Sequence, residues 1–186
     1  MLPDPQADLY PYFFEAPVEK YDFGKYHYTV VYLPAVLMAD LPLSQFSRLR
    51  IEAVVDGACL LEGALMPDTL GSPQTRHLLS IAGKPGGPPQ GERIWYFMLP
   101  RQVLRTLGKS LGEVVSLRFR VADQDAVDIP QAVQELLERH ETLREVWERL
   151  TPGKRRGLVH GVRSARSEET RLRRLEDLEN QLLDLR

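Results

Sequence analysis

Leu49-Arg-Ile-Glu-Ala-Val-Val-Asp-Gly-Ala-Cys-Leu-Leu-Glu-Gly-Ala-Leu-Met66 is the stretch that decides the fold of the first part of the chain. Apolar side chains stand at every second position from Leu49 to Val55, which is the period of a strand with one buried face. Asp56-Gly57 follows at once and suits a type I′ turn, because both central residues of that turn need a positive φ. The stretch therefore predicts two antiparallel strands joined by a tight hairpin.

Short segments with the same period lie on both sides of this hairpin. They occupy residues 26–32, 76–81, 94–99 and 114–121. A helix of two turns is expected between the last two segments, because Pro100 can begin it and Gly108 can end it. Several short strands separated by turns predict a small closed β-barrel, since closure removes the exposed edges of an open sheet.

Helical spacing replaces the strand period after residue 126. Ile129-Pro130 opens a helix, Thr142 has capping-box spacing to Glu145, and Thr151-Pro152 and Ser167 mark two further helix starts. The last helix carries a stripe of leucines that must pack either on the barrel or on a second copy of the chain, so a homodimer through this helix is one expectation. The stripe consists of Leu172, Leu175, Leu178, Leu182 and Leu185.

The overall prediction is an α+β protein with a β-barrel domain over residues 1–126 and a helical C-terminal domain over residues 127–186. With 186 residues, of which 43% are hydrophobic, the chain can bury one good core and a small second one. Its formal net charge of -2 excludes a whole-protein field that would attract nucleic acid or a membrane.

Cysteine content and the first residues of the chain bear on location. The single cysteine, Cys59, has no internal disulfide partner, which favours a reducing compartment. The N-terminal residues lack the basic start and apolar run of a secretory signal, and no stretch approaches the roughly 20 apolar residues of a membrane span. A cytoplasmic location without a membrane span is expected.

Two local patterns are similar to known families. The order strand, proline, helix, glycine, turn, strand over residues 98–121 resembles the half-barrel unit of AbrB-like double-split β-barrels. Residues 127–137, 146–156 and 164–174 resemble the C-terminal signature of the YdeI/OmpD-associated family. That resemblance implies a bacterial protein in which a small barrel domain of unknown function precedes the helices, and a bacteriocin-protection role that some members carry. Arg166, Glu113 and an added loop at residues 83–92 depart from the family pattern.

The helical part also holds the main concentration of positive charge. Residues 154–174 contain eight lysine or arginine residues against two glutamates, which makes this segment the best polyanion-binding surface of the chain. The alternative is an ordinary solvated face, on which Glu168 pairs with Arg171 and Glu169 with Arg173. The residues predicted for a polyanion surface are Lys154, Arg155, Arg156, His160, Arg163, Arg166, Arg171, Arg173 and Arg174.

Catalytic patterns are scarce. The four histidines show no close ligand spacing, and Cys59 is interpreted as a buried structural thiol. The glycine-rich loop at residues 83–91 lacks the Gly-Lys-Ser/Thr of a phosphate loop and is interpreted as a hairpin connection. No catalytic residue, metal ligand or cofactor is predicted, and the chain is expected not to be an enzyme.

Three functions remain open from the sequence. The favoured hypothesis, implied by the family resemblance, is an interaction or stress-protection module with an unidentified protein partner. The second is nucleic-acid binding through the basic helices and the AbrB-like half-barrel. The third is small-ligand binding in or beside the barrel, near the aromatic strand at residues 26–32, with His27 and His77 on neighbouring strands.

Overall fold

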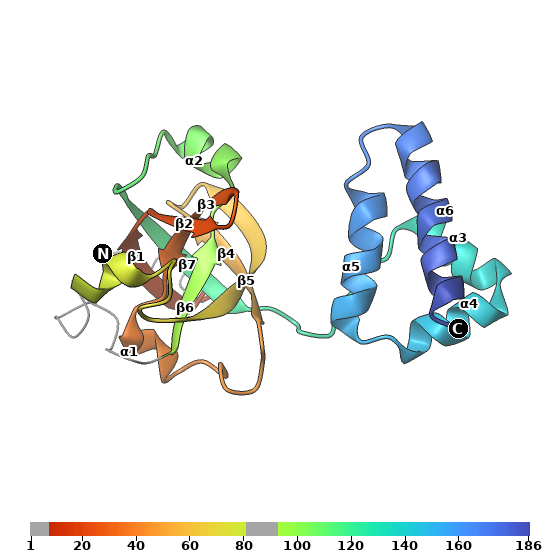
Figure 1. The fold of residues 1–186 in the computed structure, drawn as a ribbon, viewed down its shortest axis with the longest axis horizontal. Helices are drawn as coiled ribbons and strands as arrows, with labels where there is room; N and C mark the ends of the chain where they lie inside the picture. The colour runs from red at the N-terminus through yellow and green to blue at the C-terminus, as the bar shows by residue number, and fades with distance from the viewer. Residues whose placement is uncertain (1–7, 81–92) are drawn as a thin grey trace. The chain divides into compact units, whose positions relative to one another are not determined.

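The computed structural model describes residues 8–80 and 93–186, so the loop predicted at residues 83–92 lies outside the described part. The chain divides into two compact units, Met1–Ala122 and Asp123–Arg186, each with its own core (Figure 1). The first unit holds β1 Tyr12–Pro17, β2 Glu19–Phe23, β3 Tyr26–Tyr32, α1 Ala35–Met38, β4 Leu49–Val55, β5 Cys59–Thr69, the 3₁₀ helix η1 Arg76–Ser80, β6 Arg93–Met98, α2 Arg101–Leu107 and β7 Val114–Val121.

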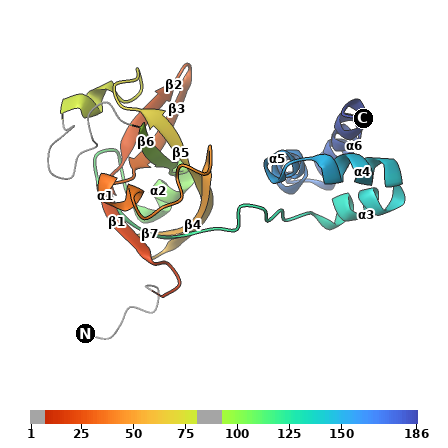
Figure 2. The ribbon, with the colours of Figure 1, turned by 90° about the horizontal axis from the view of Figure 1, so that it is seen from below.

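The seven strands form one antiparallel sheet in the order β1-β7-β4-β5-β6-β3-β2, which curls around a single core (Figure 1 and Figure 2). The expected closure of a barrel is wrong, because β1 and β2 are the two edges of an open sheet and do not pair. Only Val18 separates β1 from β2, and a connection of one residue is too short for a hairpin. Its N–H donates to the carbonyl of Glu113 at 2.9 Å and its carbonyl accepts from Gly112 at 2.8 Å. The chain therefore changes direction at Val18, and β1 and β2 remain the two edge strands of the sheet.

The predicted hairpin and the strand at residues 114–121 are confirmed. Asp56 and Gly57 have φ of 46° and 66°, as a type I′ turn requires. Gly108 ends α2 with a φ of 64°, in the left-handed region that glycine adopts without strain. The strands expected at residues 26–32 and 94–99 are also present, whereas β1 and β2 had not been predicted.

The strand expected at residues 76–81 is wrong, because Arg76–Ser80 is a 3₁₀ helix. The hydroxyl of the buried Thr75 donates to the carbonyl of Thr69 at 2.8 Å, which folds the chain back after β5. Leu78 then packs with Leu70 and Ile94. A short apolar run thus covers the sheet from outside instead of extending it.

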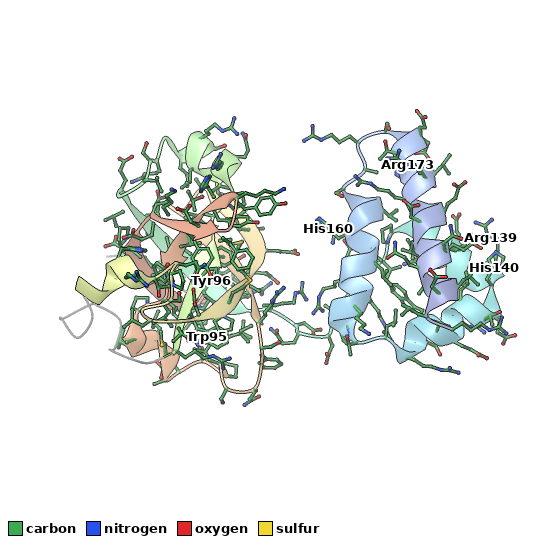
Figure 3. The ribbon with its side chains drawn as sticks, in the orientation of Figure 1. Trp95, Tyr96, Arg139, His140, His160 and Arg173 are labelled. Carbon is green, nitrogen blue, oxygen red and sulfur yellow. The ribbon has the colours of Figure 1, made fainter. Side chains whose placement is uncertain are left out.

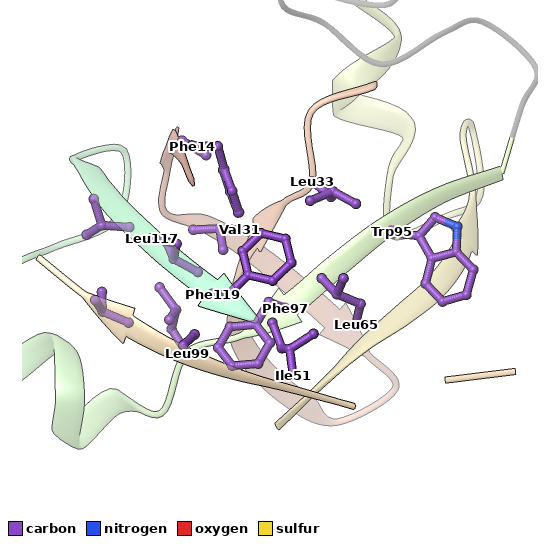
Figure 4. Packing of buried hydrophobic residues seen from close by; sticks show 14 of the residues in the cluster. Phe14, Val31, Leu33, Ile51, Leu65, Trp95, Phe97, Leu99, Leu117 and Phe119 are labelled. Atoms are coloured by element: carbon purple, nitrogen blue, oxygen red, sulfur yellow. The ribbon is translucent and has the colours of Figure 1, made fainter. Parts of the chain in front are cut away.

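The core of the first unit lies on the inner face of the curled sheet. Its fully buried side chains include Ile51, Leu65, Phe97, Leu117 and Phe119 (Figure 4). They come from β4, β5, β6 and β7, so residues far apart in the sequence meet at one place. Burying such side chains contributes about 1.5–3 kcal/mol each to folding.

The second unit contains four helices: α3 Gln131–Arg139, α4 Glu141–Arg149, α5 Pro152–Arg163 and α6 Glu168–Asp184. Thr151 and Ser167 cap α5 and α6, since their hydroxyl oxygens accept from the backbone N–H groups three residues further on. The capping box predicted at Thr142 is wrong. Only His140 separates α3 from α4, so Thr142 already lies inside the first turn.

The leucine stripe of α6 packs inside the helical unit. Leu178 and Leu182 are fully buried with Val133, Trp147 and Val159. The expectation that the stripe packs on the barrel or on a second copy is therefore wrong for these two leucines, because three shorter helices supply the partner surface. Leu172 and Leu185, at the ends of the stripe, are 54% and 51% exposed.

The close approach of Gly63 to a core ring gives a stability prediction. A Cβ at Gly63 would lie 2.5 Å from Cε2 of the buried Phe97. Gly63→Ala should lower the free energy of unfolding by about 1–3 kcal/mol, the usual effect of overpacking a core. Gly153→Ala is the control, because nothing lies within 4 Å of its added Cβ. Urea unfolding of both variants measures the difference, and equal stabilities would contradict this packing.

Candidate functional sites

Several of the arginines predicted for a polyanion surface hold the helical unit together. Arg155 donates from Nε to the carbonyl of Trp147 at 3.0 Å and from Nη2 to the carbonyl of Glu148 at 2.7 Å. Both carbonyls belong to the last turn of α4. The Trp147 carbonyl also accepts from the backbone N–H of Leu150 at 3.1 Å, so Arg155 adds a second donor there. The guanidinium also lies over the Trp147 ring, 5.8 Å from its centroid. Arg155 therefore joins the start of α5 to the end of α4.

The face of α5 that carries Arg156, His160 and Arg163 contacts the segment that enters the helical unit. Arg156 donates from Nη1 to the carbonyls of Gln124 at 2.8 Å and Ala126 at 3.0 Å. Arg163 forms an ion pair with Asp128 at 3.2 Å. Two of the three cations expected to meet a polyanion together are thus already bound to groups of this chain.

Arg174 and Arg171 are also paired. Arg174 donates from Nη1 to the carbonyl of Gly161 at 2.6 Å and to Oγ of Ser164 at 2.9 Å, which satisfies the end of α5. Arg171 and Glu168 form the predicted ion pair at 2.7 Å. The pair predicted between Glu169 and Arg173 does not form within the described residues.

Four members of the predicted set remain exposed. Within residues 8–80 and 93–186, their side chains make no hydrogen bond or ion pair. Figure 3 labels two of them, His160 on α5 and Arg173 on α6. Since they lie on two helices and in the turn between them, they do not form one stripe along a single helix. The four are Lys154, His160, Arg166 and Arg173.

The first unit has a second apolar surface, which the sequence analysis missed. We call it the outer face: the side of β2, β3, β5 and β6 that points away from the main core. Around Tyr96 the cross-strand neighbours are aromatic or apolar, with Tyr32 on one side and Met66 on the other. Tyr21 and Tyr96 stack with ring centroids 4.6 Å apart. The signal was present in β6, where Trp95, Tyr96 and Phe97 are consecutive and all buried.

A pocket of about 340 Å³ opens on the outer face. Rings and thioethers line most of it, and Ser47 and Arg48 line the part beside the start of β4. Arg48 is exposed, and its guanidinium has no hydrogen-bond or ion-pair partner in the described chain. The pocket thus combines an aromatic wall with one available cation. The full lining is Tyr21, Phe23, Tyr28, Ser47, Arg48, Met66, Pro67, Tyr96 and Met98.

The carboxylate of Asp68 binds the hydroxyl of Tyr21, one of the two stacked tyrosines that form the aromatic wall. The Tyr21 hydroxyl donates to Oδ2 of Asp68 at 2.9 Å, and the backbone N–H of Thr69 donates to Oδ1 at 2.6 Å. Burial raises the pKa of the Tyr21 phenol, and hydrogen bonds to Tyr96 and Asp68 raise it further. Tyr21 therefore stays protonated and keeps donating at neutral pH, which holds its ring in place.

The buried hydroxyl of Tyr32, beside this wall, has no hydrogen-bond partner among the described residues. Burial raises the pKa of this phenol, and the charges of Asp68 and Glu19 act in the same direction.

The two histidines considered for ligand binding are not on neighbouring strands. His27 lies on β3, with Nδ1 2.6 Å from Oδ1 of Asp22, whereas His77 lies in η1, 3.5 Å from Glu19. Neither lines the pocket. Nor does any group of three histidine, cysteine, aspartate or glutamate side chains in residues 8–80 and 93–186 lie where it could hold a metal ion.

The fold and these sites define a two-unit α+β protein with a curled antiparallel sheet and a four-helix unit. Residues 126–184 match the family described as Bacteriocin-protection, YdeI or OmpD-Associated. The match covers the helical unit, as its sequence resemblance indicated. No curated protein matches the chain. Among the helices of the described residues, none has the length and apolar character to cross a membrane.

The structural role of Arg155 gives a second prediction. Arg155→Ala removes the donors to two carbonyls of α4 and should lower the free energy of unfolding by about 1–2 kcal/mol. Arg166→Ala is the matched control, because its exposed side chain has no partner in the described structure, and it should change the stability by less than about 0.5 kcal/mol. Thermal unfolding by circular dichroism compares the two. Equal effects would show that Arg155 is not a structural residue.

Proposed function

We propose that the protein is a non-enzymatic, cytoplasmic interaction protein of bacterial type that acts in stress or bacteriocin protection. The observation that carries this proposal is the match of residues 126–184 to the bacteriocin-protection family. The matched segment coincides with a helical unit that has its own core, so it can present a binding surface as one body.

The arrangement of charge in the helical unit supports a binding role. Arg155 joins α5 to α4, Arg174 joins α6 to α5, and Arg156 joins α5 to the segment that precedes α3. The same unit also carries Lys154, Arg166 and Arg173, which are exposed and available to a partner. A preorganised surface of this kind loses little conformational entropy on binding.

A survival assay tests the role of the helical unit. Bacteriocin-sensitive cells that produce the full chain should survive better than cells without it. Leu178→Asp should abolish the protection, because an unpaired charge in the core of the unit destabilises it by more than about 3 kcal/mol. Leu172→Asp is the control on the same helix, since this side chain is 54% exposed, and it should retain the fold. Absence of protection by the full chain, or steady turnover of a substrate by the purified protein, would overturn the proposal.

Nucleic-acid binding is the second candidate function. It is favoured by the three exposed cations Lys154, Arg166 and Arg173 of the helical unit, which have no partner among the described residues, and by the AbrB-like pattern of residues 98–121, which remains a prediction. If this function holds, affinity for DNA or RNA falls steeply with salt.

The triple variant Lys154→Glu, Arg166→Glu, Arg173→Glu separates the two functions without touching the structural arginines. Under nucleic-acid binding it should weaken retention and reduce the slope of log affinity against log salt by about 3. The matched control reverses Arg139, Arg144 and Arg149, which form exposed pairs of small energetic value. Equal retention of the two triple variants on DNA and RNA columns would exclude these cations as the contact surface.

A further inference from the structure

We propose that the pocket on the outer face of the sheet binds a small planar aromatic molecule that carries an anionic group. This proposal concerns the first unit alone. It does not rest on the function proposed for the helical unit.

The pocket exists because β6 is apolar on both faces. In β6, Trp95 and Phe97 point to the main core, while Tyr96 and Met98 belong to the outer face. An antiparallel sheet with one solvated face normally carries polar side chains there. The outer face of this sheet instead holds tyrosines and methionines, and η1 covers only the part near Leu70 and Ile94.

The shape and lining of the pocket favour a flat ring. The stacked Tyr21 and Tyr96 are 7% and 5% exposed and form a fixed wall. Phe23 and Tyr28 are 62% and 37% exposed, so they offer ring surface that no part of the described chain covers. A ring between such side chains gains stacking and sulfur contacts. The volume of about 340 Å³ lies in the range of small-molecule sites.

The positive charge of Arg48 favours an anionic ligand over a cationic one. Arg48 lines the pocket and is exposed, and its guanidinium has no hydrogen-bond or ion-pair partner in residues 8–80 or 93–186. Asp68 is not among the residues that line the pocket, and both of its carboxylate oxygens already accept hydrogen bonds, from the Tyr21 hydroxyl and the Thr69 N–H. Ser47 adds a hydroxyl beside Arg48. A carboxylate or phosphate on the ring can therefore form charge-assisted hydrogen bonds with Arg48.

Calorimetric titration of the full chain tests the proposal with naphthoate, a flat ring with one carboxylate. Naphthoate should bind, whereas naphthylmethylammonium, which has the same ring and the opposite charge, should not. Arg48→Glu should weaken naphthoate binding by about tenfold or more, because it removes a charge-assisted contact and adds repulsion. Tyr28→Ala should weaken it by about tenfold through loss of ring contact.

Arg105→Glu is the matched control. Arg105 is an exposed residue of α2 outside the pocket, so the same charge reversal there should leave the affinity unchanged. Circular dichroism of each variant confirms that the fold is kept. The proposal is overturned if naphthoate does not bind, if the ammonium analogue binds equally well, or if Arg48→Glu and Arg105→Glu have the same affinity. Since Leu178→Asp acts only on the helical unit, it should leave naphthoate binding intact even where protection is lost.

Discussion

The two apolar faces of β6 are the constraint on which the first unit depends. Its neighbours β5 and β3 pair with it on either side, so its inward side chains sit at the centre of the main core. The same register places Tyr96 between Met66 and Tyr32 on the outer face. Because successive side chains of a strand alternate, the packing that fixes Phe97 inside also fixes Tyr96 outside. The core and the pocket are therefore two results of one strand register.

Arginine has a different role in each unit. In the helical unit, Arg155 and Arg174 donate to carbonyls at the C-terminal ends of α4 and α5. The planar guanidinium can satisfy two acceptors at once, as both side chains do here. In the first unit, Arg48 lies beside a pocket and has no such partner in the described chain. The same residue type therefore makes structural contacts at Arg155 and Arg174 and offers an available ligand contact at Arg48.

Local patterns predicted the local structure well. The turn at Asp56-Gly57, the end of α2 at Gly108 and the caps at Thr151 and Ser167 follow from the backbone preferences of single residues. Closure of the barrel could not be predicted in this way, because it depends on whether β1 and β2 meet. The hydrogen bonds of Val18 to residues 112 and 113 decide that question, and they join positions far apart in the sequence. Residues 76–80 were misassigned for a similar reason, since the bond from Thr75 to Thr69 outweighs a short apolar run.

The candidate binding residues could not be fully predicted either, because their contacts also join residues far apart in the sequence. The count of basic residues in the helical part was correct, yet the spacing of Arg156, His160 and Arg163 could not reveal that carbonyls of residues 124 and 126 and the carboxylate of Asp128 already bind two of them.

The charge available to a ligand in the pocket likewise depends on which ion pairs and hydrogen bonds the neighbouring charged side chains form in the fold. On the outer side of β4, Glu52 is bound by Arg120 at 2.6 Å, and Asp68 is bound by Tyr21 and Thr69. These contacts engage the nearby carboxylates and leave Arg48 available. The anion preference inferred for the pocket thus arises from local pairing, in a chain whose formal net charge is -2.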